Sequence, residues 1–380
     1  MSVAAALRRR AMRAAGALPP SLLRRLTGPP IERDGQTLDP LLGPVLRVAR
    51  RGGSVERRGV LGARRWIRSR SSLLTPAAPR AVEWHDEPLA LAGGARSLIV
   101  RRYRPSGAEP TNGLLIFFHG GGWVTGSLDS HHGVCATLAQ RAGCDVASVD
   151  YRLAPEHPWP AAVDDAEQAM VALVEREGDG EGRPIAVGGD SAGGHLAAVA
   201  ARHARAHALP LAAQLLVYPV LIGRGADRAH AESASVRLFG DGFALDTSTM
   251  GWFFEQHVGG RDGIDLDDPR LSPGRADDLV GLAPAVVVTA GFDVLRDEGE
   301  DYAEQLAAAG VATRFRRFPS LVHGFLHLAG GIPTADAALS TVADDLADAL
   351  RGELDPLRSD VVASGEASES AGDRRDRVQS

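Results

Sequence analysis

Three side chains that can act together as a nucleophilic triad follow predicted strands in the order serine, aspartate, histidine. Ser191 lies in Gly-Gly-Asp-Ser-Ala-Gly-Gly, between an apolar run and a helix-like run. Asp293 comes three residues after the apolar run 284–290, and His323 lies just past the last predicted strand. In such a triad the histidine takes the serine proton, while the aspartate fixes the histidine tautomer. The order predicts that Ser191 is the nucleophile, His323 the base and Asp293 the acid.

The residues around Ser191 favour a nucleophile on a sharp turn over a small residue in an ordinary strand-to-helix connection. A Gly-x-Ser-x-Gly match alone does not decide between these interpretations. Here the serine follows a predicted strand and precedes a predicted helix, which is the context that such a turn requires. Side chains at Gly189 or Gly193 would collide across the turn, and the first amides of the helix would face charge developing beside the serine. We expect Gly189, Asp190 and Gly193 to support the turn.

A second glycine-rich stretch, His-Gly-Gly-Gly-Trp at 119–123, follows the predicted strand 113–118. Three successive glycines present consecutive backbone N–H groups without side chains in the way, which is how donors are offered to a developing oxyanion. The Ala192 amide would be a further donor. A flexible loop or a phosphate cradle is the alternative, but no lysine accompanies these glycines. We predict an oxyanion hole here, with His119 and Gly122 in supporting positions.

Two further acidic residues, Asp297 and Glu298, compete with Asp293 for the third triad position. Both fall in the first turn of a helix predicted at 297–309, where acidic side chains interact favourably with the helix dipole. Asp293 precedes that helix, at a strand end, where sites collect in open α/β sheets. The positions therefore favour Asp293.

The elements that must position these side chains form an α/β pattern. Apolar runs alternate with helix-like stretches, which is typical of a mostly parallel sheet with helices on both faces. Two runs that flank Ala92-Gly93-Gly94 predict an antiparallel hairpin, so the sheet is expected to be mixed. The predicted strands lie at 113–118, 145–151, 184–189, 213–218, 284–290 and 313–319, and the helices at 130–142, 161–177, 193–206 and 297–309.

The composition excludes several other chemistries. All 42 basic residues of the 380-residue chain are arginine, which excludes mechanisms that need a lysine amine, such as Schiff-base chemistry and the P-loop. The chain has no Gly-x-Gly-x-x-Gly and no His-Glu-x-x-His, and His203 and His207 share a helix face without a third ligand nearby. Cys135 and Cys144 are expected to be buried free thiols. We expect no cofactor and no metal.

The chain divides into three parts by composition. Residues 1–80 carry 17 arginines against four acidic residues, although the whole chain has a net charge of −6. Residues 81–351 hold the strand–helix alternation, which an aromatic-rich insert interrupts at about 221–272. Such an insert after a sheet strand suits a lid over a site near the strand ends. Residues 352–380 are polar and are predicted to be disordered.

The basic start of the chain has two interpretations. The stretch 1–27 is typical of a basic amphipathic helix, broken at Pro19-Pro20. Packing of one helix face on the main domain is favoured, and contact with an anionic membrane surface is the alternative. The stretch lacks the charge order of a secretory signal, and no apolar run approaches the ~20 residues of a membrane span. A cytoplasmic location is therefore expected.

Several motifs, taken in order, resemble the hormone-sensitive-lipase-like family of α/β-hydrolases over about 81–350. The resemblance implies an α/β-hydrolase fold and a carboxylic ester hydrolase without a cofactor. It also implies a helical cap made from 1–80 and the insert at about 221–272. The motifs are HGGGW at 119–123, DYRLAPEHPWPAAVDD at 150–165, GGDSAGGHLA from Gly188, DPRLSP at 268–273, GFDVLRDEGEDYAEQL from Gly291, and HGF from His323.

The same resemblance implies roles for single residues. Ser191, Asp293 and His323 match the family's triad. The family's oxyanion positions correspond to Gly120, Gly121 and Ala192. Asp190 before the nucleophile is similar to the Gly-Asp-Ser-Ala-Gly branch, and the stretch 33–42 resembles the cap of bacterial members.

Several functions stay open at this point. A serine esterase acting on short- to medium-chain acyl esters is favoured, while an amidase, a lactonase or an acyltransferase would use the same triad. A non-catalytic small-molecule receptor on the same fold would have lost the catalytic histidine, whereas His323 is in place. The expected partner is a small-molecule ester and not a nucleic acid, and a homodimer is an open alternative.

The neighbours of the two glycine-rich stretches also have two interpretations. One interpretation is that the acyl pocket is bordered by Asp129, His131 and His132. The other is that these residues belong to a solvated turn. Trp123 is expected to pack rather than to touch substrate. His195, one helical turn past the nucleophile, is expected to be buried support.

Overall fold

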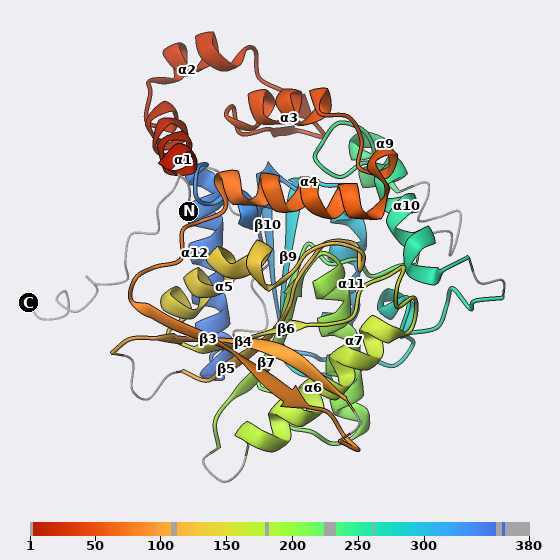
Figure 1. The fold of residues 1–380 in the computed structure, drawn as a ribbon. Coiled ribbons are helices and arrows are strands. Elements are labelled where there is room, and N and C mark those ends of the chain that lie inside the picture. The colour runs from red at the N-terminus through yellow and green to blue at the C-terminus, as the bar shows by residue number, and fades with distance from the viewer. Residues whose placement is uncertain are drawn as a thin grey trace, which may run out of the picture.

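The computed structural model describes residues 3–94, 96–107, 112–178, 182–223, 233–260, 263–354 and 359–361. A central sheet is covered by helices, and further helices lie across one end of it (Figure 1). The first part contains α1 (Val3–Gly16), α2 (Pro20–Thr27), β1 (Glu32–Arg33), β2 (Gln36–Thr37), α3 (Leu42–Arg51), η1 (Glu56–Arg58) and α4 (Gly59–Leu74).

The main part begins with a hairpin and then alternates strands with helices. Its strands are β3 (Val82–Ala90), β4 (Ser97–Pro105), β5 (Leu114–Phe118), β6 (Asp145–Asp150), β7 (Ile185–Asp190), β8 (Ala213–Val217), β9 (Ala285–Phe292), β10 (Thr313–Val322) and β11 (Ser359–Val361). Its helices are α5 (Leu128–Ala142), α6 (Ala161–Glu177), α7 (Ala192–Ala206), α9 (Ala234–Phe239), α10 (Thr247–Val258), η2 (Pro273–Arg275), α11 (Arg296–Ala308), η3 (Phe325–Leu328) and α12 (Pro333–Leu350).

Within the described residues, nine strands form one sheet in the order β11-β10-β9-β8-β7-β5-β6-β4-β3. All neighbours from β11 to β6 are parallel, and β6, β4 and β3 pair antiparallel. The central strands are buried on both faces because helices cover both, and their side chains are accordingly almost all apolar. The predicted α/β class, the parallel sheet and the antiparallel hairpin are confirmed.

The two faces of the sheet carry separate apolar layers. Helices α5 and α12 lie side by side on one face, where Leu138 and Leu339 belong to one buried cluster. Helices α6 and α7 pair on the other face, where Leu173 and Leu196 belong to a second cluster. Since the parallel strands all end at the same edge, this arrangement brings the loops after β5, β7, β9 and β10 together.

The N-terminal segment lies against the edge of the sheet where those strands end. In Figure 1, α4 crosses above the strands, and α9 and α10 of the 221–272 insert lie at one end of it. The break between α1 and α2 falls at the predicted proline pair. Arg64 of α4 donates to the carbonyl oxygen of Val124 at 2.8 Å and of Ala154 at 3.0 Å.

The end of the chain differs in part from the expected disordered tail. Ser359–Val361 form β11, which pairs in parallel with β10 because that strand otherwise leaves one row of backbone groups open at the sheet edge. The residues 355–358 and 362–380 lie outside the described part of the chain. No helix in the described ranges is long and apolar enough to cross a membrane.

Candidate active site

Ser191, His323 and Asp293 lie in one hydrogen-bonded row at the carboxyl edge of the sheet. The Nε2 atom of His323 is 2.9 Å from Ser191 Oγ, and its Nδ1 atom is 2.8 Å from Asp293 Oδ2. Asp293 is fully buried, and its Oδ1 atom accepts from the Leu295 N–H at 3.0 Å. The carboxylate is thereby fixed in place. With the histidine proton held on Nδ1, the Nε2 lone pair faces the serine hydroxyl.

The turn that carries Ser191 is strained and tightly held. Ser191 has φ 57° and ψ −119°, a conformation that costs a non-glycine residue about 1–3 kcal/mol and persists only where the surroundings fix it. Its N–H donates to Val217 O at 2.9 Å, and its carbonyl accepts from Val220 N–H at 3.2 Å. A side chain at Gly193 would overlap the Phe118 carbonyl oxygen, which explains the glycine there.

Asp190 connects the nucleophile turn to the glycine loop. Its Oδ1 atom accepts from the Gly120 N–H at 2.8 Å, and the Tyr218 hydroxyl donates to its Oδ2 atom at 3.4 Å. Burial raises the pKa of Asp190, but neighbouring His131 and His327 and the Gly120 N–H outweigh it and hold that pKa well below its ordinary value. The side chain is therefore an anion that anchors the loop.

The same contact corrects the expected role of Gly120. Its N–H is bonded to Asp190, so it is not a free donor for an oxyanion. Among the described residues, none accepts from the N–H groups of Gly121, Gly122 or Ala192. The three glycines cannot be told apart in the sequence. Only the fold shows which of their N–H groups donates to the buried carboxylate.

The two competing acids are engaged elsewhere. Asp297 accepts from the Ser235 N–H at 2.8 Å. Glu298 accepts from the Leu221 N–H at 2.8 Å, and burial raises its pKa well above the ordinary value. Both lie in the first turn of α11, as predicted, and both hold the insert rather than the histidine.

Two buried histidines, His119 and His195, lie near the turn. His195 accepts from Trp123 Nε1 at 3.2 Å, and its Nε2 lies 3.0 Å from the Arg270 carbonyl oxygen. Burial lowers the pKa of His195 to about 4 and that of His119 to about 3, so both rings are neutral at pH 7. His119 Nδ1 is 2.9 Å from Gly120 O. These rings shape the loop and the turn from behind.

The residues after the glycine loop separate into two groups. Asp129 pairs with Arg101 at 3.0 Å, and His132 Nδ1 lies 3.1 Å from the Tyr103 hydroxyl. Both therefore contact β4 rather than the triad. His131 points the other way, with Nε2 at 3.0 Å from Asp190.

Both cysteines are buried and free, as expected.

The insert and the N-terminal segment meet beside the glycine loop. Phe253 of α10 is buried with Ala63 of α4 and Val124, which follows the loop. A side chain at Gly122, whose φ is 60°, would overlap the Phe253 ring. Thr249 of α10 donates to Glu56 at 3.3 Å. Two segments far apart in the sequence thus share one apolar cluster against the loop.

A comparison with known proteins agrees with this geometry. A family described as alpha/beta hydrolase fold matches residues 115–327. The chain belongs to this family, the hormone-sensitive-lipase-like α/β-hydrolases. The chain is 43% identical over 301 residues to the carboxylic ester hydrolase LipN of Mycobacterium tuberculosis, covering 78% of each chain. It is 38% identical over 291 residues to an ethyl acetate hydrolase of Pseudomonas putida, covering 75% of this chain and 88% of that one.

Solved structures of esterases have the same fold. An ester hydrolase from the metagenome of Lake Arreo, complexed with a bipyridine phosphonate derivative, matches with a TM-score of 0.72 at 37% identity, over 80% of this chain and 95% of that one. A thermostable esterase from Pseudomonas putida matches with a TM-score of 0.74 at 32% identity, over 81% of this chain and 96% of that one. Both similarities extend over most of each chain.

Proposed function

We propose that this protein is a serine carboxylic ester hydrolase that acts on short- to medium-chain acyl esters through an acyl-enzyme. The row from Ser191 through His323 to Asp293, with contacts of 2.9 and 2.8 Å, carries this proposal. The names of its relatives, a carboxylic ester hydrolase and an ethyl acetate hydrolase, support the ester as the bond that is cleaved.

In the first half-reaction the serine is acylated. His323 Nε2 takes the proton of Ser191 Oγ as the oxygen attacks the ester carbonyl carbon, and the Asp293 carboxylate stabilises the imidazolium. The tetrahedral intermediate then collapses, the alcohol leaves with the proton from Nε2, and the acyl group stays on Oγ. In the second half-reaction water replaces the alcohol and releases the acid by the same proton transfers.

The oxyanion of both intermediates would be held by the N–H groups of Gly121, Gly122 and Ala192. Their freedom from other acceptors in the described structure supports this role, and α7 begins at Ala192, so its positive dipole end faces the same charge. Each such donor contributes about 10²- to 10³-fold in rate. Gly120 would act indirectly, because its bond to Asp190 fixes the loop.

The N-terminal segment and the insert would form one cap over the acyl pocket. The shared cluster around Phe253 and the Thr249–Glu56 contact support this role. A cap that excludes water from the acyl chain would make kcat/KM rise with chain length, by up to ~0.8 kcal/mol for each CH₂ buried. Deletion of 1–80 should flatten that dependence.

The basic stretch 1–27 would be the outer surface of this cap in a cytoplasmic enzyme. Arg13 of α1 donates to the carbonyl oxygen of Gly330 at 3.0 Å and pairs with Asp336, which supports packing on the main domain. A chain lacking 1–27 should keep its activity on short esters, and neither chain should bind anionic vesicles. A salt-sensitive vesicle affinity that the deletion removes would favour a membrane contact instead.

The decisive experiment compares the wild type with Ser191→Ala. We expect a burst of nitrophenol from nitrophenyl acetate, followed by slower turnover, and the variant should retain only ~10³–10⁴-fold catalysis over water. A variant within tenfold of the wild type would refute the nucleophile. A panel of esters, amides, lactones and acyl acceptors separates the other bond types, and binding without any turnover would indicate a receptor.

A further inference from the structure

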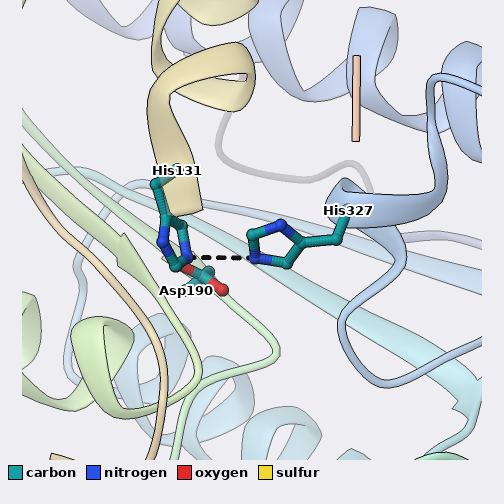
Figure 2. Close-up of side chains that lie close together, drawn as sticks. All are labelled: His131, Asp190 and His327. Atoms are coloured by element: carbon teal, nitrogen blue, oxygen red, sulfur yellow. Dashed lines mark hydrogen bonds and ion pairs between the residues drawn. The ribbon is translucent and has the colours of Figure 1, made fainter. Parts of the chain in front are cut away.

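Three side chains that take no part in the proposed proton transfers meet behind the nucleophile turn. Figure 2 shows His131 from α5, Asp190 from the end of β7, and His327 from η3, with one nitrogen of each ring pointing toward the other ring. His131 Nε2 lies 3.0 Å from Asp190 Oδ1 and 3.1 Å from His327 Nε2. One potential ligand atom from each residue lies within 4.8 Å of the others.

Hydroxyl groups on the outer sides of the rings orient both histidines. Ser130 Oγ is 2.9 Å from His131 Nδ1, and Thr75 Oγ1 is 3.3 Å from His327 Nδ1. The Ser130 hydroxyl donates its single proton to Ser127 O, so it accepts from His131 Nδ1–H. The Nε2 atom of His131 is then the one that faces Asp190 and His327. Such outer hydrogen bonds are how proteins fix the tautomer of a metal-binding histidine.

A carboxylate and two imidazole rings offer one small ion three suitable ligand atoms. His131 Nε2 lies 3.0 Å from the Asp190 carboxylate and 3.1 Å from His327 Nε2, so an ion at the centre would take the place of the hydrogen in these contacts. Nitrogen and carboxylate ligands of this kind suit Zn²⁺ and similar ions better than Mg²⁺ or Ca²⁺, which prefer oxygen.

We propose that His131, Asp190 and His327 bind one divalent transition-metal ion, with Zn²⁺ the best match. Donor atoms on a tetrahedral ion with bonds of roughly 2.0–2.1 Å lie roughly 3.3 Å apart, so binding requires the contacts of 3.0 and 3.1 Å to lengthen slightly. His131 and Asp190 are buried and His327 is partly exposed, so the ion would enter from the side of His327, and a water molecule would complete its coordination.

The ion would be structural and not catalytic. It would join the start of α5, the end of β7 and the η3 turn, which follows His323 by two residues. Asp190 also accepts from Gly120 N–H, so the ion would connect the glycine loop at 119–123 with the turn that follows His323. The sequence did not indicate this site because its ligands come from three distant segments. His203 and His207, by contrast, are four residues apart in the sequence and share one helix face.

The test measures Zn²⁺ binding by the full-length chain after removal of metal with a chelator. Competition with a chromophoric chelator should show about one tight Zn²⁺ site per chain. Thr75→Val removes an outer hydrogen-bond partner and should lower the Zn²⁺ affinity by ~10–100-fold. His327→Gln removes a ligand and should lower the affinity by more than that. Cobalt in place of zinc should give the visible bands of a tetrahedral site, and His327→Gln should remove them.

Two controls make the outcome decisive. Ser191→Ala should abolish esterase activity and keep full Zn²⁺ affinity, so failure of this site and failure of the proposed function are distinguishable. The double variant His203→Ala/His207→Ala should also keep the affinity. Circular dichroism checks the fold of His327→Gln, and His131→Gln replaces it if the first variant does not fold. The proposal is overturned if the folded ligand variant binds Zn²⁺ as tightly as the wild type. It is also overturned if the His203→Ala/His207→Ala variant loses Zn²⁺ binding.

Discussion

The nucleophile turn and the N-terminal segment are held in place by different means. Around Ser191 the contacts are main-chain hydrogen bonds and close backbone packing in a buried setting. The N-terminal segment is attached through buried apolar side chains, such as Leu42 and Ala63, and through arginine ion pairs, such as Arg64 to Glu156 and Arg50 to Asp241. Exposed ion pairs contribute only about 0–1 kcal/mol, whereas the main-chain contacts of the turn must at least offset its strain.

The difference matches the two tasks that we propose for these regions. Proton transfer between Ser191 and His323 requires atoms placed to within a few tenths of an ångström, which buried backbone contacts provide. A cap must admit and release substrate, and contacts that exchange readily with water allow such movement. Substitutions in the turn should therefore act on chemistry, and substitutions in the cap should act on substrate preference.

The largest expected effect among variants that keep the nucleophile is that of Asp293→Asn. The oxygen of the amide stays with the Leu295 N–H and its NH₂ group donates to Nδ1, so His323 takes the wrong tautomer and kcat should fall by about 10⁴. Asp297→Asn is the matched control one turn further on, and it should act mainly on stability through its bond to Ser235 N–H. Steady-state kinetics and thermal melts of both variants measure this, and the reverse ranking would move the acid to Asp297.

The next largest effect should come from Gly122→Ala. Its φ of 60° and its contact with Phe253 leave no space for a methyl group, so the loop must shift and carry its N–H away from the oxyanion. Loss of one donor predicts a decrease in kcat of about 10²–10³. Adding Phe253→Ala should restore part of the loss. A kcat near that of the wild type would exclude Gly122 as a donor.

The sequence was most informative where local pattern decides structure. The strand and helix positions of the sheet followed from apolar runs and their spacing, as at 161–177, which is a helix over the same residues. It was least informative where distant segments meet. The choice of Asp190 as partner of Gly120, and the meeting of His131 with His327, depend on the packing of elements that no local pattern specifies.

His257 offers a test of the junction between the two regions. This buried ring of the insert stacks on Trp123 at 4.3 Å, and neither ring nitrogen has a hydrogen-bond partner among the described residues. Burial lowers its pKa to about 3, against ~6.5 in the unfolded chain. Between these values the unfolded chain binds a proton that the folded chain does not, so stability falls as pH drops below ~6.5.

The expected outcome follows from that difference in proton binding. At pH 5 the titration of His257 should cost on the order of 2 kcal/mol relative to pH 7.5. His257→Phe keeps the stacking and removes the titration, so its free energy of unfolding should fall less on acidification by about that amount. Urea unfolding at both pH values measures it. Parallel pH dependences in the two proteins would show that the ring is not neutral and buried in solution.

The smallest effect should come from Arg64→Ala, and it bears most directly on the cap. Arg64 donates to the Val124 and Ala154 carbonyl oxygens and pairs with Glu156, so it joins α4 to the loop beside Gly122. Each such hydrogen bond contributes about 0.5–1.5 kcal/mol, and the loosened helix would let water reach the acyl chain. We expect kcat/KM for hexanoate esters to fall several-fold and that for acetate to stay nearly unchanged.

Arg50→Ala is the matched control for this prediction, because it removes an arginine of the same segment from a pair that is exposed on both sides. Its effect on either ester should lie within experimental error, since such pairs contribute little. The ratio of the two kcat/KM values for each variant is therefore the measurement. Equal ratios for Arg64→Ala and the wild type would mean that α4 does not cover the acyl chain. A changed ratio for Arg50→Ala would mean that exposed pairs, and not the contacts at the loop, hold the cap in its place.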